Sequence, residues 1–169
     1  MDCVLKMKLE FGCGETPTKA GFKTCDIRNL PGIDYVCPAW DIDKQVKENS
    51  VDEIFSRHFF EHLTFAQGEK QLEVWHKILK PGGLCEIVLP NLTFHLNQLT
   101  NHRNNTKQVR HALAGLWGWQ RGVFDDTWDI HKSGYDKDLL TSILEKKGFK
   151  NIISLEPITS PHLHIKGIK

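Results

Sequence analysis

The chain has 169 residues, of which 40% are hydrophobic and 25% charged, and 22 basic against 21 acidic residues leave a formal net charge of +1. These values are typical of one soluble globular domain, here spanning residues 1–169, and no block of like charge indicates a nucleic-acid surface. The opening residues 1–14 mix charged with apolar side chains. They therefore predict neither a secretory signal nor a membrane span, and we expect a cytoplasmic protein with no membrane partner.

The cysteines are odd in number and lie mostly in apolar runs. They are Cys3, Cys13, Cys25, Cys37 and Cys85. This usage is typical of reduced, buried thiols in a cytosolic protein. The twelve-residue spacing of Cys13, Cys25 and Cys37 matches no metal-ligand pattern, so the sequence predicts no metal site.

Short β-type runs dominate the first third of the chain. We expect strands over 4–11, 22–27 and 33–39. Only the seven residues ETPTKAG separate the glycines after the first run from the second run. That interval is too short for a crossover helix, and Pro17 allows a turn at most.

The rest of the chain alternates strand and helix patterns. Strands are expected over 51–57 and 84–89, an amphipathic helix over 67–79, one or two helices within 92–116, an ordered loop over 116–135, a helix over 138–147, and antiparallel closing strands over 149–155 and 162–168. The helix over 67–79 ends at Lys-Pro-Gly-Gly, which combines a basic last turn with two stop signals. Without repeats or linkers, this order predicts a single α/β domain.

Polar and glycine residues follow the first strands, where a parallel sheet accepts ligands. Glu10, Gly12 and Gly14 form an acidic residue followed by a tight turn. Asp26 ends the second strand and is placed to accept hydrogen bonds from ribose hydroxyls, while Asp41 follows the third strand and is placed to meet an adenine amino group. Each aspartate taken alone is equally typical of a helix cap or a turn.

Five sequence blocks, in order, carry a resemblance to a known family. They are LEFGCG, GFKTCDIRNLPGIDYV, SVDEIFSRHFFEHL, LKPGG and HKSGYDKDLLTSILEKKGF. The chain resembles the class I S-adenosylmethionine-dependent methyltransferases, in a short form of the type 11 kind. The resemblance implies a Rossmann-like three-layer αβα sandwich, with a mostly parallel seven-stranded sheet whose last strand is antiparallel, and S-adenosylmethionine as cofactor.

The resemblance also assigns cofactor contacts. Residues of the glycine turn (Glu10, Gly12, Cys13 and Gly14) would meet the methionine part, Asp26 the ribose, Asp41 and Ile42 the adenine, and Arg57 and His58 the methionine carboxylate or the sulfonium. The family's usual helices before the first strand and after the glycine turn are missing from this sequence. Weak cofactor binding, or coverage of one sheet face by a second copy in a homodimer, would follow. The glycines do not continue into GxGxxG, which disfavours a nicotinamide cofactor.

Histidines are the leading candidates for a proton acceptor, which methyl transfer to a hydroxyl would require. His58 and His131 are the catalytic candidates, with the pair Asp125 and Asp126 as a further possibility. Glu61 and His62 are expected to anchor the loop after the fourth strand. Three tryptophans, Trp117, Trp119 and Trp128, form either an aromatic wall for a sugar or planar substrate or a hydrophobic plug.

The sequence thus predicts a methyltransferase acting on a small molecule or carbohydrate, with O-methylation of a sugar favoured by analogy alone. No basic groove indicates a nucleic-acid acceptor. The alternative is a catalytically inactive cofactor-binding or interaction protein with the same fold, which the missing helix suggests. No GxSxG elbow supports a hydrolase.

Overall fold

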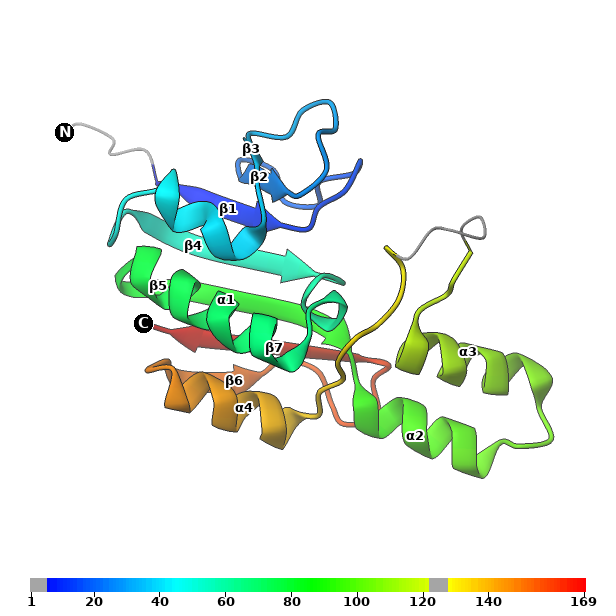
Figure 1. The fold of residues 1–169 in the computed structure, drawn as a ribbon. Coiled ribbons are helices and arrows are strands. Elements are labelled where there is room, and N and C mark those ends of the chain that lie inside the picture. The colour runs from blue at the N-terminus through cyan, green and yellow to red at the C-terminus, as the bar shows by residue number, and fades with distance from the viewer. Residues whose placement is uncertain (1–5, 122–127) are drawn as a thin grey trace.

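The computed structural model describes residues 6–121 and 128–169. Its centre is a seven-stranded sheet in the order β3-β2-β1-β4-β5-β7-β6 (Figure 1). The strands are β1 (Lys8–Phe11), β2 (Lys23–Asp26), β3 (Tyr35–Val36), β4 (Val51–Arg57), β5 (Leu79–Pro90), β6 (Lys150–Ser154) and β7 (His162–Ile168). All neighbouring pairs from β3 to β5 are parallel, whereas β7 is antiparallel to both β5 and β6. The predicted α/β fold with an antiparallel last strand is confirmed.

Helices cover one face of this sheet. The α-helices are α1 (Phe65–Ile78), α2 (Leu92–Asn101), α3 (Thr106–Trp117) and α4 (Lys137–Lys146), with 3-10 turns η1 (Ala39–Lys44) and η2 (Phe60–His62). Figure 1 shows η1, α1 and α4 on the same side of the sheet, while α2 and α3 form a hairpin beyond the end of β5. None of the helices in the described ranges is long and apolar enough to cross a membrane.

The core lies between that helical layer and the sheet. Leu9, Ile54 and Cys85 occupy one register line across β1, β4 and β5, and all three are buried. Trp75 from α1 is fully buried against the Phe11 ring, with ring centroids 5.1 Å apart. Burial of such aromatic and branched side chains is the main stabilisation that this layer supplies.

The opposite face is polar where a second helical layer would need apolar side chains. Glu10, Phe55, Glu86 and Lys166 share the next register line. Glu86 is 3% exposed and meets the imidazole of His164 at 2.8 Å, as well as the ammonium groups of Lys166 at 3.3 Å and Lys19 at 3.5 Å. The predicted three-layer αβα sandwich would have helices on this face of the sheet. In the part of the chain that the structure describes, the ion network lies there.

A loop over 12–22 replaces the crossover helix, as the short interval predicted. The Glu10 carboxylate accepts hydrogen bonds from the backbone amides of Thr18 at 2.9 Å and Lys19 at 3.0 Å, and from the Thr18 hydroxyl at 2.7 Å. The Lys19 ammonium then lies 4.4 Å from the centroid of the Phe55 ring. The loop is therefore fastened to the sheet by a buried carboxylate and a cation–π contact.

Candidate active site

The glycine turn follows β1 at the point where the sheet order reverses between β1 and β4. Gly12 and Gly14 have φ of 66° and 60°, a backbone region that favours glycine. The Gly12 amide donates to the Cys25 carbonyl at 2.9 Å. A Cβ on Gly12 would lie 2.6 Å from the Cβ and Cγ atoms of Phe59, so the turn passes too close to that ring for any side chain.

Asp26 closes the turn from the end of β2. Its carboxylate accepts the Gly14 amide at 3.0 Å and the Arg28 amide at 2.9 Å. The Arg28 guanidinium occupies the remaining acceptor positions, with Nε 3.2 Å from Oδ1 and Nη2 3.4 Å from Oδ2. Burial alone would raise the pKa of Asp26, but the hydrogen bonds from Arg28 and Gly14 outweigh it and lower the pKa. Asp26 is therefore an anion at neutral pH.

A cavity of about 600 Å³ opens beside these two features, which we call the cofactor cavity. Its floor is the glycine turn and the ends of β2 and β4, and its rim is the segment after residue 128. The lining residues are Gly12, Cys25, Asp26, Ile27, Arg28, Pro38, Ala39, Trp40, His58, Phe59, His62, Leu63, Gln67, Trp128, Asp129 and Lys132. The cavity thus combines two carboxylates, Asp26 and Asp129, with two tryptophans at the carboxyl ends of parallel strands, where open α/β sheets bind ligands.

A second cavity of about 300 Å³ adjoins it under α2 and α3, which we call the histidine cavity. His58, His62 and Asp129 line both cavities. The full lining is His58, Glu61, His62, Pro90, His95, His111, Ala114, Gly115, Trp119, Asp129, His131, Pro161 and His162. Six imidazoles therefore surround one small space that opens toward the cofactor cavity.

His58 stands at the junction of the two cavities. It follows β4 with a φ of 49°, an unusual value for a residue with a side chain, and its amide is held by the Val88 carbonyl at 2.9 Å. Its Nδ1 lies 3.1 Å from Oε1 of Glu61. Because a carboxylate accepts at this position, Nδ1 donates the hydrogen bond, which in a neutral ring leaves the lone pair on Nε2. A strained residue held in this way at a ligand cavity is typical of a functional site.

The imidazoles deeper in the histidine cavity are neutral. Burial lowers the pKa of His131 and of His162. Burial, with the neighbouring His111 adding to it, lowers the pKa of His95 to about 4. At neutral pH these groups therefore offer lone pairs to a ligand instead of positive charge.

Three metal-ligating side chains also meet here. Glu61, His62 and His131 each offer one ligand atom, and these atoms lie within 4.8 Å of one another. This group could not be predicted from the sequence, because His62 and His131 are 69 positions apart and neither lies in a metal-binding spacing.

Of the residues predicted to bind the cofactor, the structure brings Gly12, Asp26 and His58 to the lining of the cofactor cavity. Cys13 and Gly14 belong to the same turn without lining it. Glu10 is 1% exposed and faces the polar side of the sheet, where residues 18 and 19 use its carboxylate.

The predicted adenine contacts lie elsewhere. Ile42 is fully buried in the core, and Asp41 forms an ion pair with Lys44 at 2.8 Å. Instead, Ala39 and Trp40, one turn earlier in η1, line the cavity. The sequence could not separate these neighbours, because which of them faces the cavity depends on the rotation of a six-residue 3-10 turn.

Of the remaining predicted residues, two line a cavity and the others do not. Arg57 is exposed at the end of β4 and lines neither of them, and neither does Trp117. Trp119 lines the histidine cavity and Trp128 the cofactor cavity. The pair 125–126 lies outside the described residues.

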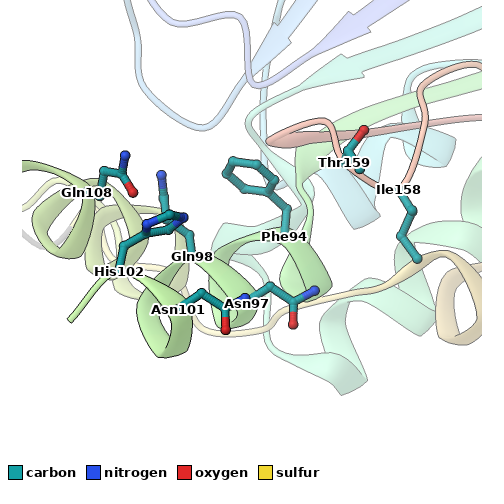
Figure 2. Close-up of a pocket in the computed structure, with 8 residues that line it drawn as sticks. All are labelled: Phe94, Asn97, Gln98, Asn101, His102, Gln108, Ile158 and Thr159. Atoms are coloured by element: carbon teal, nitrogen blue, oxygen red, sulfur yellow. The ribbon is translucent and has the colours of Figure 1, made fainter. Parts of the chain in front are cut away.

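Another hollow, of about 410 Å³, lies on the outer side of the α2–α3 hairpin. Figure 2 shows that its side chains come from α2, the start of α3 and residues 158–159. They are Phe94, Asn97, Gln98, Asn101, His102, Gln108, Ile158 and Thr159. It contains no carboxylate and none of the turn residues, so it is separate from the site described above.

Comparison with known proteins agrees with this fold. The methyltransferase domain family matches residues 18–87, from the loop after β1 into β5. No curated protein matches the sequence. The family match over residues 18–87 and the class I methyltransferase fold of the sheet agree with the resemblance that the sequence predicted.

Three solved structures illustrate the likeness. A SAM-dependent methyltransferase from Archaeoglobus fulgidus has a TM-score of 0.66 at 16% identity, with 98% of this chain and 87% of that chain covered. The CurJ carbon methyltransferase gives 0.63 at 14%, with 98% and 49% covered. The 1,6-didemethyltoxoflavin-N1-methyltransferase of Burkholderia thailandensis, with S-adenosylhomocysteine bound, gives 0.59 at 13%, with 96% and 70% covered. This chain thus spans between about half and nearly nine-tenths of their lengths, and the named acceptor atoms differ among them.

Proposed function

We propose that this chain transfers the methyl group of S-adenosylmethionine to a hydroxyl of a small molecule or carbohydrate. The observation that supports this proposal is the junction of two cavities at His58. One contains the glycine turn and Asp26, and the other is lined by six imidazoles. A cofactor in the first and an acceptor in the second would meet at this residue.

The cofactor cavity suits a nucleoside ligand in volume and in chemistry. Its volume of about 600 Å³ falls inside the usual range for small-molecule sites. A carboxylate has about four lone-pair positions, and the backbone amides of Gly14 and Arg28 use two of those on Asp26. The other two face the Arg28 guanidinium over the longer distances of 3.2 and 3.4 Å. Two ribose hydroxyls would replace that side chain, while Trp40 and Trp128 offer flat surfaces to the adenine.

The chemistry needs little more than orientation and a proton acceptor. The bound cofactor supplies a methyl group that is already activated on a sulfonium, so the protein must hold the acceptor oxygen in line with it. His58 is placed to receive the proton of an acceptor hydroxyl at Nε2, because Glu61 fixes the proton of its imidazole on Nδ1. Trp119, half-exposed at the entrance of the histidine cavity, is suited to stack on a sugar ring.

Cofactor binding is tested by titration calorimetry with S-adenosylmethionine and its demethylated product. We expect a dissociation constant in the micromolar range, about −8 kcal/mol, and a loss of at least about tenfold in Asp26→Ala. The matched control is Asp43→Ala, because Asp43 forms an ion pair with Lys77 at 2.8 Å and lies outside the cavity lining. Arg28→Ala should bind more tightly, since it removes the side chain that competes with the ribose. Unchanged affinity in Asp26→Ala would refute the assignment.

Transfer itself is tested by release of the demethylated cofactor in a screen of sugar and small hydroxylated acceptors. With an active acceptor, His58→Ala should lower kcat by about 10² to 10⁴, the usual contribution of a positioned base. Cofactor binding should persist in that variant. If the unaltered chain binds cofactor and no acceptor releases product, while His58→Ala and His131→Ala leave binding and biological activity intact, the inactive binding protein becomes the better explanation.

A further inference from the structure

Three side chains with metal-ligating nitrogen or oxygen atoms, Glu61, His62 and His131, lie close together in the lining of the histidine cavity. Glu61 and His62 come from η2 and His131 from the segment before α4, and one ligand atom from each lies within 4.8 Å of the others. The two segments are joined by backbone hydrogen bonds, since the amides of Lys132 and Ser133 donate to the Glu61 carbonyl at 2.8 and 3.1 Å. The donors are therefore held together by the main chain.

Both imidazoles have one nitrogen fixed by the backbone. Nδ1 of His62 lies 3.1 Å from the carbonyl of Ile130, and Nδ1 of His131 lies 3.1 Å from the carbonyl of Gly115. A carbonyl can only accept, so each Nδ1 donates the hydrogen bond, which in a neutral ring leaves the lone pair on Nε2. This arrangement, in which a carbonyl orients the ring from behind, is the usual outer shell of a metal-binding histidine.

The carboxylate of Glu61 supplies an independent sign of a missing ligand. Glu61 is 1% exposed, and although Oε1 meets His58, its Oε2 atom is buried and has no hydrogen-bond partner among the residues that the structure describes. A buried carboxyl oxygen without a partner is costly, and such atoms in native structures commonly mark an ion or a water. A cation between the three side chains would satisfy this atom.

We propose that Glu61, His62 and His131 bind a divalent transition-metal ion of the Zn²⁺ class. Two imidazoles with one carboxylate favour such an ion over Mg²⁺ or Ca²⁺, which prefer all-oxygen sites. Three protein ligands leave at least one coordination position open, and that position faces the histidine cavity.

The ion would bind an acceptor hydroxyl at its open position and make that hydroxyl more acidic, within reach of His58. This role rests on the proposed methyl transfer, whereas metal binding itself does not. His131 is then a ligand, and His58 alone remains as the proton acceptor.

The test is titration of the untagged, chelator-treated protein with Zn²⁺ by calorimetry and with Co²⁺ by visible absorption. We expect one equivalent to bind with micromolar or tighter affinity, and Co²⁺ to give the intense d–d bands of a low-coordinate site. His62→Ala, His131→Ala and Glu61→Gln should each weaken binding at least tenfold. His102→Ala, an exposed histidine at the end of α2, is the matched control and should change nothing.

The unaltered protein provides a check that does not depend on folding of the variants. Co²⁺ should shift the imidazole proton resonances of His62 and His131 in paramagnetic NMR spectra and leave those of His102 in place. Absence of binding at millimolar metal would overturn the proposal, as would binding that persists in His62→Ala and His131→Ala. Titration with S-adenosylmethionine, with and without metal, keeps the two proposals separate, because cofactor binding in Asp26's cavity can succeed when metal binding fails.

Discussion

Replacement of Gly12 by alanine tests the close packing of the glycine turn against the Phe59 ring. A residue with a side chain at a φ of 66° costs about 1–2 kcal/mol relative to a relaxed backbone. The added Cβ would also lie 2.6 Å from two Phe59 atoms, and overpacking of this kind costs about 1–3 kcal/mol. Phe59 has little room to move, because its ring packs on Phe11 and Trp75 at centroid distances of 6.5 and 6.4 Å. We therefore expect Gly12→Ala to lower the free energy of unfolding by about 2–5 kcal/mol.

Gly21→Ala is the matched control. Gly21 has a φ of 80°, yet no atom of the described residues 6–121 and 128–169 lies within 4 Å of the Cβ that alanine would add. It should show only the conformational cost of about 1–2 kcal/mol. Any gain from restricting the unfolded chain is common to both variants and cancels in the comparison.

Urea unfolding, followed by tryptophan fluorescence and far-UV circular dichroism, measures both values. Coincident transitions and unchanged m-values are required for the comparison. Calorimetry should add a loss of cofactor affinity in Gly12→Ala alone, because Phe59 lines the cofactor cavity and Gly21 does not. Equal destabilisation by the two substitutions would refute the packing argument.

Two further predictions concern stability. Burial raises the pKa of Glu86, but the hydrogen bond from His164 and the neighbouring Lys19 and Lys166 outweigh it and hold the pKa below its ordinary 4.5. A carboxyl group whose pKa is lowered in the folded state stabilises the fold at pH values above its ordinary pKa, so Glu86→Gln should lower the free energy of unfolding by about 1–3 kcal/mol at pH 7. The difference between the two proteins should shrink when urea unfolding is measured at pH values below 4.5, where the Glu86 carboxyl becomes protonated. A difference that does not change with pH would contradict this prediction. Thr64 caps α1 through a reciprocal capping box, so Thr64→Ala should lower the free energy of unfolding by about 1 kcal/mol, and an unchanged urea midpoint would show that the cap contributes nothing.

Local patterns in the sequence were enough for most of the fold. The strand expected over 51–57 and the strand expected over 162–168 are β4 and β7 with the same bounds. The helix expected over 67–79 begins two residues earlier, because the capping box at Thr64 starts it. The strand expected over 33–39 shrinks to Tyr35–Val36, since Pro38 ends the extended run and η1 begins directly after it.

Site residues that come together only in the folded chain could not be predicted from the sequence. The glycine turn and Asp26 each follow a strand, and parallel order brings their ends together, so they were predictable. The histidine cavity draws on residues from η2, α2, α3, the segment before α4 and β7. The spacing of these residues in the sequence does not predict that they meet, because the lining of the histidine cavity depends on how the α2–α3 hairpin packs over the end of β5. The histidine at position 131 was found only through the resemblance.

The exchange of a helix for a loop explains why Glu10 lies away from the cofactor cavity. In a chain with a full crossover helix, the helix would support the glycine turn through its own packing. Here the turn continues into residues 15–22, which form no helix, and four hydrogen bonds from Thr18 and Lys19 to the Glu10 carboxylate hold that segment in place. Lys19 then extends the support to Glu86 on β5. The contacts that join Glu10, residues 18 and 19, and Glu86 are all polar. This face of the sheet can therefore be in contact with water while these contacts hold the glycine turn in place. The acidic residue of the motif therefore positions the backbone that carries Gly12 and Gly14, and the proposed cofactor contact with this turn would depend on Glu10 through that backbone.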